Sequence, residues 1–434
     1  MAVEYSKIAD VLAGKLTGKK VHLRGWVHRA RSSGGMAFLV VRDGTGVVQC
    51  TVKKDAVGEK AFADAGKAYV ESSCRLEGTV KEDTRAPGGF EVGASGFELV
   101  CLGEAFPIAK DQSTEFLLDT RHLWLRSQRL TAIMKARDYV VRYLREFFFS
   151  KEFMEFAPPI ITKAGCEGGS TLFPIKYFDD EAYLTQSGQL YAEAFIYTYP
   201  LVFILAPSFR MEPSRTVKHL AEYWHLEPEM AWYDQKMNEK LQEEMLEFVC
   251  QKFAKEHVDL LEVIGTRKPE ELRKVKGPFP RMTYEDAVDA VRKKGLKFKE
   301  GGDFGADEEQ ALTAEHEKPL FITSFPLKLK SFYMREDPDD KGKALAADML
   351  APQGHGELIG SSERIWELDE LMGRMKQEKM DVKDYQWYVD LRKYGSVPHS
   401  GFGLGIERLV KWVLNLDHIR DTIPFPRVIN RVYP

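Results

Sequence analysis

The 434-residue sequence lacks the two glycine loops by which many proteins hold nucleotides. No GxxxxGK[ST] segment occurs, which excludes a P-loop. The pattern that begins Gly401-Phe-Gly403 has isoleucine at position 406, where a dinucleotide fingerprint requires glycine or alanine. It also lies near the end of the chain rather than after an early strand. If a nucleotide binds, it must be held by other groups, such as arginines on a sheet.

Cysteine and long apolar runs are also scarce. The five cysteines, at positions 50, 74, 101, 166 and 250, include no CxxC pair, and their odd number fits no simple disulfide framework. We expect free thiols in a reducing compartment and no structural zinc. The most apolar run, residues 194–206, is short and interrupted by tyrosine and proline, so it predicts core rather than a membrane span. The first residues lack a cationic and apolar signal region, so we expect a cytoplasmic protein with no membrane association.

What the chain has is an enzyme-like composition with one basic region. Hydrophobic residues make up 44% and charged residues 29%, and the length allows two or three domains. The net charge of −4 opposes a protein that coats nucleic acid over its whole surface. Between positions 19 and 54, however, eight lysines and arginines accompany a single acid, with Trp26 and Phe38 among them. Such a patch attracts phosphates and stacks unpaired bases, although a solvated basic strand face is the alternative.

The first hundred residues read as short strands separated by turns. Strands are expected at residues 21–27, 36–42, 47–52, 73–80 and 96–102, with a helix near 56–68. Five short strands with one helix predict an OB-like barrel, a fold that often binds single-stranded nucleic acid. The fold alone does not establish that use.

The rest of the chain mixes strands and helices with long connections. Residues 105–125 read as a connector, and a long amphipathic helix is expected from about 130 to 149. Further strands are expected at 182–186, 201–206, 208–212, 223–233, 346–351, 356–360 and 398–405. Further helices are expected at 188–198, 237–256, 284–293, 364–378, 381–391 and 407–414. This order favours an α+β fold with an antiparallel sheet, and the charged stretch 257–345 reads as a loop-rich insertion.

Two segments that contain arginine give the first indication of a ligand. Arg210 and Glu212 are two residues apart on an extended segment, so their side chains point to the same face. Arginine offers a phosphate a forked hydrogen bond and a carboxylate accepts from an amino group, which together suit a nucleotide. Nearly two hundred residues later, Arg408 follows a glycine-rich strand at the start of a helix. For either arginine alone, a surface salt bridge is the alternative.

These segments resemble the class II aminoacyl-tRNA synthetases of the aspartate, asparagine and lysine subgroup. The family's three motifs match 153–161, with its essential Pro159, then 209–223, and then 403–408, in the family's order. Glu152 stands where the family usually has glycine. The resemblance implies an OB-fold anticodon-binding domain over 1–104, a hinge over 105–128, and an antiparallel-sheet catalytic domain flanked by helices over 129–434. It also implies a homodimer with Pro159 at the interface.

The resemblance further implies how ATP is held. Arg210 grips the α-phosphate, Arg408 grips the γ-phosphate, and His219 reaches the outer phosphates. Glu212 accepts from the adenine amino group, and Tyr223 stacks on the ring where relatives often have phenylalanine. The implied ATP-binding set is Arg210, Glu212, His219, Leu220, Tyr223, Glu357, Gly405 and Arg408, with Arg210, Glu212 and Arg408 as catalytic residues.

Asp348 and Glu357 resemble the acidic Mg²⁺ ligands of the subgroup. Hard divalent cations prefer oxygen ligands and keep several waters, so two carboxylates plus the ATP phosphates suffice. Two exposed acids that flank a turn are the alternative. The metal interpretation is favoured because Arg364 follows seven residues after Glu357, where the family has the arginine for the amino-acid side chain. Ser361 departs from the family's usual Gly-Gly-Ser at this point.

The amino acid is inferred from positions that differ within the subgroup. Ser187 and Gln189 resemble residues around the substrate α-amino group, and Glu167 resembles the acid of a mobile loop that closes over it. Aspartate-specific relatives have lysine at the place of Ala192 and aspartate at the place of Glu227, so this chain favours an amide over a second carboxylate. We expect Glu227 to lie opposite Arg364, and the alternative is that Glu227 pairs with Arg364 only as a structural contact. The implied amino-acid set is Glu167, Ser187, Gln189, Arg210, Glu227, Gly360 and Arg364.

In the predicted barrel, Phe38 and Gln49 match positions that, in this subgroup, stack on and hydrogen-bond the middle anticodon bases. The resemblance implies that Arg29 and Arg31 contact the phosphates there. A core phenylalanine is the alternative for Phe38. We therefore predict a homodimeric ligase that uses ATP and Mg²⁺ to activate L-asparagine and charge tRNA, specifically tRNA(Asn). The alternatives are an aspartate–tRNA ligase with a relaxed pocket, a tRNA-binding or regulatory paralogue without ligase activity, and a paralogue that makes free asparagine.

Overall fold

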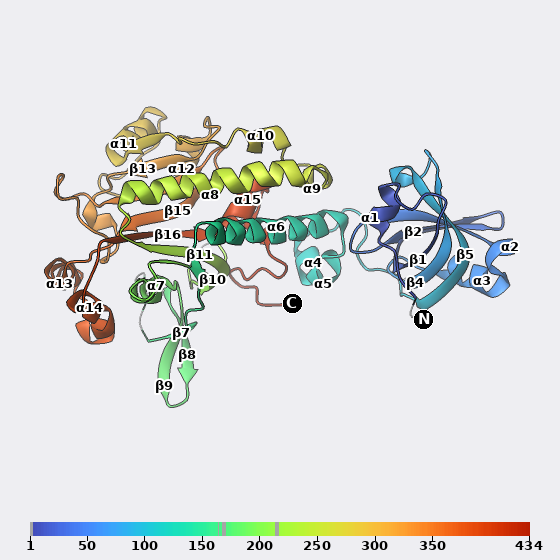
Figure 1. Cartoon of the computed structure of the whole chain (residues 1–434), viewed down its shortest axis with the longest axis horizontal. Helices are drawn as coiled ribbons and strands as arrows, with labels where there is room; N and C mark the ends of the chain where they lie inside the picture. The colour runs from blue at the N-terminus through green and yellow to red at the C-terminus, as the bar shows by residue number, and fades with distance from the viewer. Residues whose placement is uncertain (1–2, 164, 167–170, 213–216) are drawn as a thin grey trace. The chain divides into compact units, whose positions relative to one another are not determined.

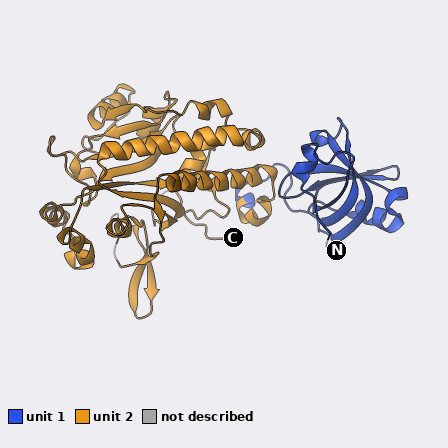
Figure 2. Ribbon diagram, viewed as in Figure 1, with its two compact units in different colours: residues 1–117 blue, residues 118–434 orange. Residues whose placement is uncertain are grey.

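The computed structural model describes residues 3–163, 165–166, 171–212 and 217–434. The chain divides into two compact units, residues 1–117 and residues 118–434 (Figure 2). Each unit has an apolar core of its own.

Unit 1 is a closed five-stranded barrel, which confirms the predicted OB fold. Its strands are β1 (Lys20–Ser33), β2 (Met36–Arg42), β3 (Val47–Lys53), β4 (Ser73–Glu82) and β5 (Phe90–Cys101), in the order β1-β2-β3-β5-β4. The last strand begins at Phe90 rather than at 96, because Glu91 and Val92 pair in parallel with β3 and so close the barrel. The predicted single helix at 56–68 is two helices, because Gly58 has a φ of +85° between them. The helices of this unit are α1 (Ile8–Leu12), α2 (Lys54–Val57) and α3 (Glu59–Lys67).

Strand β2 shows why the barrel forms from this sequence. Leu39 is fully buried inside the barrel, and the two residues on either side of it, Phe38 and Val40, point outward. The same alternation places apolar side chains from all five strands in one core, and α1 adds Ile8 and Val11 to it. The outward position of Phe38 contradicts the alternative that it is a core phenylalanine.

Unit 2 is built on an eight-stranded sheet in the order β12-β13-β14-β15-β16-β11-β10-β6. The strands are β6 (Met154–Glu155), β10 (Leu201–Phe209), β11 (Glu222–Ala231), β12 (Arg281–Thr283), β13 (Leu320–Thr323), β14 (Ala346–Ala351), β15 (Gly356–Glu363) and β16 (His399–Gly405). The run from β13 to β10 is antiparallel, as the sequence predicts. The outermost pairs, β12 with β13 and β6 with β10, are parallel, so the whole sheet is mixed.

Long helices cover one face of this sheet. Figure 1 shows α6 (Gln128–Ser150) and α8 (Gln235–Glu256) lying across it, and α15 (Ile406–Val413) packs on the same core. Ser127 caps α6 and Asp234 caps α8 through side-chain oxygens that accept backbone N–H groups. The helices bury side chains such as Phe148 and Phe253 against the strands. The opposite face of the sheet is therefore the one that remains for a ligand.

The stretch 257–345 is not loop-rich, contrary to the sequence interpretation. It contains α9 (Val258–Ile264), α10 (Pro269–Arg273), α11 (Tyr284–Lys293) and α12 (Ala306–Thr313), besides the strands β12 and β13 and a short 3-10 turn, η3 (Leu327–Leu329). Many of its charged residues lie on the outer sides of short amphipathic helices, as in α11, while Tyr284, Val291 and Phe325 form a separate apolar cluster with β13 and β14. The stretch therefore completes one edge of the main sheet.

Among the predicted boundaries of unit 2 that differ from the structure, two have an identifiable reason. The two strands expected at 201–206 and 208–212 are the single strand β10, which continues through Pro207. Proline is tolerated there because β6 pairs only with Val202 and Phe203, which leaves Pro207 on an open edge. The helix expected from 364 begins at Leu368 as α13 (Leu368–Gln377), because β15 continues to Glu363 and pairs with β16.

The remaining elements surround the sheet. A small sheet in the order β7-β9-β8 comprises β7 (Ile161–Thr162), β8 (Phe173–Tyr177) and β9 (Asp180–Leu184), and it leads into α7 (Gln189–Phe195). The other helices are α4 (Thr114–Asp119), α5 (Arg121–Trp124) and α14 (Gln386–Lys393). Among the described residues, no helix has the length and apolar character needed to cross a membrane. All five cysteines lie in the described ranges as free thiols, four of them buried and Cys101 exposed.

Candidate active site

A cavity lies on the sheet face opposite α6 and α8. Alternation along β11 explains this position, since Leu226 and Met230 belong to the core under the helices while Glu227 points the other way. The cavity gathers nearly all of the described residues predicted for ATP, amino acid and metal, namely Ser187, Gln189, Arg210, His219, Leu220, Tyr223, Glu227, Asp348, Glu357, Gly360, Arg364, Gly405 and Arg408. Glu212 does not line it. Glu167 lies outside the described residues.

Arg408 stands in the first turn of α15 and reaches across to β15. Its Nη1 donates to the Glu357 carboxylate at 2.9 Å and to the Glu357 carbonyl oxygen at 3.1 Å. Burial raises the pKa of the Glu357 carboxyl, but the Arg408 guanidinium outweighs it and brings that pKa to about 2. The carboxylate is therefore held in its charged form at the cavity wall.

Asp348 on β14 is the second acid of this wall. Lys330 Nζ donates to both of its carboxylate oxygens, at 2.7 and 2.8 Å. Burial raises the pKa of Asp348 to about 6, and the nearby Glu357 charge adds to the rise. A Cβ at Gly360 would lie 3.5 Å from a Glu357 oxygen and 3.8 Å from an Asp348 oxygen, so the two carboxylates converge above this glycine. No larger group of His, Cys, Asp and Glu suited to a metal occurs in the described part of the chain.

Two lysines of the cavity were missed by the sequence analysis. Lys330 lies just after η3 within the stretch interpreted as an insertion, and no local pattern distinguishes it. Lys218 directly precedes His219, a residue of the second motif, and this neighbour was a signal by which Lys218 could have been found. It pairs with Glu309 of α12 at 2.6 Å, and Glu309 also accepts from the Glu357 backbone N–H at 2.9 Å. The stretch 257–345 thus forms part of the cavity wall.

The far end of the cavity holds buried charges. Glu227 accepts from the Ser187 hydroxyl and from the Gly188 N–H at 2.8 Å, and His225 Nδ1 lies 3.3 Å from it. Its partner is not Arg364, which contradicts both the expected opposition of these two residues and the alternative of a purely structural pair. Arg364 instead forms a two-pronged pair with Glu229, at 2.5 and 3.3 Å.

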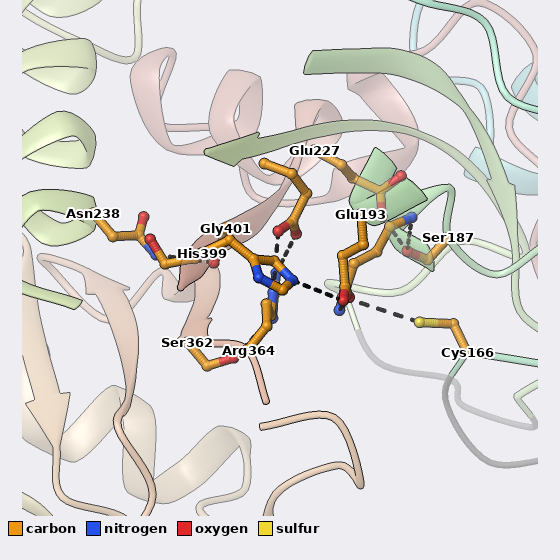
Figure 3. Close-up of polar contacts among 12 residues, drawn as sticks. Cys166, Ser187, Glu193, Glu227, Asn238, Ser362, Arg364, His399 and Gly401 are labelled. Atoms are coloured by element: carbon orange, nitrogen blue, oxygen red, sulfur yellow. Dashed lines mark hydrogen bonds and ion pairs between the residues drawn. The ribbon is translucent and has the colours of Figure 1, made fainter. Parts of the chain in front are cut away.

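The register of the strands explains why Arg364 pairs with Glu229 rather than with Glu227. Gly401 of β16 lies opposite both Glu229 of β11 and Ser362 of β15, so the end of β15 that carries Arg364 is level with Glu229. A Cβ at Gly401 would lie 2.1 Å from a Glu229 carboxylate oxygen, so the carboxylate occupies the space that any other residue would need. Figure 3 shows Arg364 among the buried polar side chains of this region, with Ser362 and His399 nearby. The glycines of this strand make room for functional side chains rather than for a phosphate loop.

The aromatic and acidic residues of the second motif lie near the other end. Tyr223 and His225 have ring centroids 5.4 Å apart, and His219 Nε2 lies 4.0 Å from Glu212. Burial lowers the pKa of His219, with the Arg408 charge as a further cause. Glu212 keeps 40% of its side chain exposed, outside the cavity lining.

Unit 1 presents the residues predicted to contact an anticodon. The Arg31 guanidinium lies 4.7 Å from the centroid of the Phe38 ring, on the outer face of the barrel. Gln49 Nε2 donates to Glu91 at 2.8 Å, and Arg29 is exposed. A partly exposed aromatic ring beside guanidinium groups offers both stacking and phosphate contacts.

Known proteins resemble the chain over almost its whole length. A family model described as tRNA synthetases class II (D, K and N) matches residues 113–429, and one described as an OB-fold nucleic acid binding domain matches residues 21–100. An asparagine–tRNA ligase of Thermoplasma acidophilum is 46% identical, with 98% of this chain and 99% of that protein covered. An asparagine–tRNA ligase of Thermococcus kodakarensis is 48% identical, with 98% of each covered.

Solved structures give the same result. Asparaginyl-tRNA synthetase from Pyrococcus horikoshii, complexed with asparaginyl-adenylate, matches with a TM-score of 0.96 at 47% identity and covers 100% of both chains. The corresponding enzyme of Entamoeba histolytica, also with asparaginyl-adenylate, matches with a TM-score of 0.88 at 33% identity and covers 97% of this chain and 98% of that one. With the motif residues gathered in one cavity and an OB barrel preceding it, the chain belongs to the class II tRNA synthetases of the D, K and N group.

Proposed function

We propose that the protein is an aminoacyl-tRNA ligase that activates L-asparagine with ATP and transfers it to the 3′ end of tRNA(Asn). One observation carries the choice of asparagine. Glu227 is only 3% exposed at the wall of the cavity, while the charge of Arg364 is already balanced by Glu229. A neutral side-chain amide can donate to the Glu227 carboxylate, whereas the carboxylate of aspartate would be repelled by it. The names of the full-length relatives support the same substrate.

The ATP-binding roles rest on the cavity geometry and on the family motifs. Arg210 is assigned to the α-phosphate and Arg408 to the γ-phosphate, with His219 near the outer phosphates. Tyr223 is assigned to the adenine ring, with Leu220 and Gly405 beside the nucleotide, and Glu212 to the adenine amino group. Arginines fixed in a largely buried cavity stabilise charge that builds up on the reacting phosphorus.

The chemistry needs no covalent bond to a side chain. An oxygen of the asparagine carboxylate attacks the α-phosphorus, the bond from that phosphorus to the bridging oxygen breaks, and pyrophosphate leaves. A ribose hydroxyl of the terminal tRNA adenosine then attacks the carbonyl carbon of the mixed anhydride, and AMP leaves. Orientation and charge stabilisation by Arg210 and Arg408 account for the rate in this proposal, with Ser187, Gln189 and Gly360 orienting the amino acid.

Asp348 and Glu357 fit a Mg²⁺ site, because two carboxylates converge above Gly360 beside the proposed phosphate positions. A Mg²⁺ ion bound there with ATP would neutralise charge on the phosphates. Lys330 pairs with Asp348 and Arg408 pairs with Glu357, so each of these two carboxylates has a cationic partner of its own.

The remaining roles concern partners. Unit 1 is proposed to bind the tRNA anticodon through Phe38, Gln49, Arg29 and Arg31. The protein is proposed to form a homodimer through the first motif, where Pro159 is exposed next to the exposed side chains of Ile160 and Ile161. Large apolar side chains left on a surface are typical of such an interface.

The substrate is tested by amino-acid-dependent exchange of pyrophosphate into ATP. We expect exchange to be stimulated by asparagine, and charging of tRNA(Asn) transcripts to require the same amino acid. Exchange stimulated by aspartate alone would refute the proposed pocket. Lack of stimulation by either amino acid would instead favour a paralogue without ligase activity.

A further inference from the structure

A buried carboxylate lies just behind the proposed asparagine site. Glu193 of α7 is fully buried and does not line the cavity. One of its oxygens accepts from Gln189 Nε2 at 3.0 Å. The other oxygen contacts the Tyr388 hydroxyl at 2.6 Å, Arg392 Nη2 at 2.6 Å and His399 Nε2 at 3.1 Å. Figure 3 shows Glu193 and His399 facing each other in this cluster.

Helix geometry brings the cluster together. Gln189 and Glu193 are four residues apart in α7, and Tyr388 and Arg392 are four residues apart in α14. Residues at this spacing share one face of a helix, so two helices nearly two hundred residues apart in sequence present matching pairs. Burial raises the pKa of the Glu193 carboxyl, but Arg392 and His399 outweigh it and hold the pKa below its usual value. The group is therefore an ionised carboxylate that only accepts hydrogen bonds.

This fixes the orientation of the Gln189 amide. Because Glu193 can only accept, it takes the amide nitrogen of Gln189. The amide oxygen accepts a long contact from the Cys166 thiol at 4.0 Å, and its second lone pair is the group that Gln189 can offer to a ligand. Gln189 lines the cavity beside Ser187. The α-ammonium group of an amino acid needs hydrogen-bond acceptors, so a glutamine held in this orientation suits it.

The same carboxylate also secures the backbone around Arg364. Arg392, which donates to Glu193, donates through Nε to the carbonyl oxygen of Ile365 at 2.8 Å. His399, which also contacts Glu193, accepts through its carbonyl oxygen from the Arg364 N–H at 2.9 Å. One backbone contact of Arg364 and one of the next residue, Ile365, are thus made by residues that contact Glu193.

We propose that Glu193 is a positioning residue for the amino-acid substrate, acting through Gln189 on the α-ammonium group and through Arg392 and His399 on Arg364. It contacts neither the substrate nor the reacting atoms. The inference rests on the proposed activation of asparagine, and it assigns a role to a residue outside the family motifs.

The substitution Glu193→Gln tests the inference because it keeps the shape and changes only the hydrogen-bonding character. The new amide must turn its oxygen toward the donors Tyr388, Arg392 and His399, which leaves its NH₂ facing the NH₂ of Gln189. Gln189 must then flip and present NH₂ groups to the α-ammonium. We expect the KM for asparagine to rise roughly tenfold to a hundredfold, because this is the effect of losing one charge-assisted hydrogen bond to the substrate. The KM for ATP should change less than about twofold.

The double variant Glu193→Gln with Gln189→Glu provides the rescue. The carboxylate moves to position 189, where it accepts from the new amide at 193 and still offers an acceptor to the α-ammonium. We expect the KM for asparagine to return to within a few-fold of the original value. The variant keeps the net charge of the pair, so it also serves if the single variant does not fold.

Tyr388→Phe is the matched control. It removes a donor from the other oxygen of Glu193 and an acceptor from Arg392, and it leaves in place the bond from Gln189 to Glu193 and the bonds from Arg392 to Glu193 and to Ile365. It should lower the melting temperature and leave the KM for asparagine unchanged. The inference is overturned by an unchanged KM for asparagine in Glu193→Gln, by an equal rise in the KM for both substrates, or by failure of the double variant to rescue. Wild-type protein in the same assay separates this failure from failure of the proposed function, because that function requires wild-type exchange to respond to asparagine.

Discussion

Replacement of Gly401 by alanine should break the ion pair between Arg364 and Glu229 although neither of these two residues is substituted. The added methyl would lie 2.1 Å from a Glu229 oxygen and 2.2 Å from its carboxyl carbon, distances that no packed atoms keep. The carboxylate must leave, and Arg364 remains buried without its partner. Breaking a buried ion pair by loss of one partner costs about 3 to 5 kcal/mol, so we expect this loss in the free energy of unfolding of unit 2. Asparagine-dependent pyrophosphate exchange should fall with it.

A double-mutant cycle with Glu229→Ala gives the decisive measurement. Glu229→Ala alone should also cost about 3 to 5 kcal/mol, since it leaves the same arginine unpaired. In the double variant the methyl at 401 fills space that Glu229 has vacated, so the two costs should not add, and the coupling should be about 3 kcal/mol or more. The assay is denaturant unfolding followed by tryptophan fluorescence, beside the exchange assay. Additive costs would refute the reasoning, because they would mean that the two changes act on separate features.

Gly373 offers a matched glycine control. It lies within α13, and a Cβ there would meet no atom within 4 Å. Gly373→Ala should therefore be neutral or stabilise unit 2 by up to about 1 kcal/mol. A loss as large as that of Gly401→Ala would show that alanine at a glycine is harmful in this protein for a general reason.

Three further predictions concern other parts of the molecule. Arg408→Ala should lower pyrophosphate exchange by about 10²-fold to 10³-fold and leave tRNA binding unchanged, the loss expected when one transition-state donor is removed; weaker tRNA binding with normal exchange would contradict the assignment of the units. Phe38→Ala should weaken tRNA charging by about 1 to 3 kcal/mol in apparent tRNA affinity while exchange stays within about twofold, measured by varying tRNA concentration. Burial lowers the pKa of His355 to about 4. Below about pH 6.5 this histidine is therefore protonated in the unfolded chain and still neutral in the folded chain, so the free energy of unfolding falls as the pH is lowered. At pH 5 the difference is about 2 kcal/mol relative to pH 8, and His355→Gln should remove most of it in paired unfolding measurements at the two pH values; an undiminished acid loss would exclude His355 as its source.

Local pattern was enough to predict the elements that depend on neighbours in sequence. The strict alternation around Leu39 fixes which face of its strand is buried, so the barrel followed from the sequence. Where the motif residues lie could be expected for the same reason. Arg210 directly follows β10, and Arg408 lies in the first turn of α15 just after β16, and apolar residues of both strands form the core.

Partner choice could not be predicted, because it depends on register between strands that are far apart in the chain. Glu227 and Glu229 are two residues apart on β11, so both side chains point to the same face of the sheet. Only the alignment of Gly401 with both Glu229 and Ser362 decides which acid meets Arg364. Lys330 was missed because its partner Asp348 is supplied by a strand rather than by a local motif. The Glu193 cluster and the Glu229 to Arg364 pair escaped notice for the same reason, because distant segments supply the partners.

The uneven burial of the thiols makes the protein convenient to label. Burial raises the pKa of Cys74 and of Cys250 to about 12 and that of Cys50 well above its usual value, so these thiols carry almost no reactive thiolate at neutral pH. Cys101, at the end of the last barrel strand, is exposed. A maleimide fluorophore added to the native protein should therefore react much faster at Cys101 than at Cys50, Cys74 or Cys250, and it would place a reporter on the barrel.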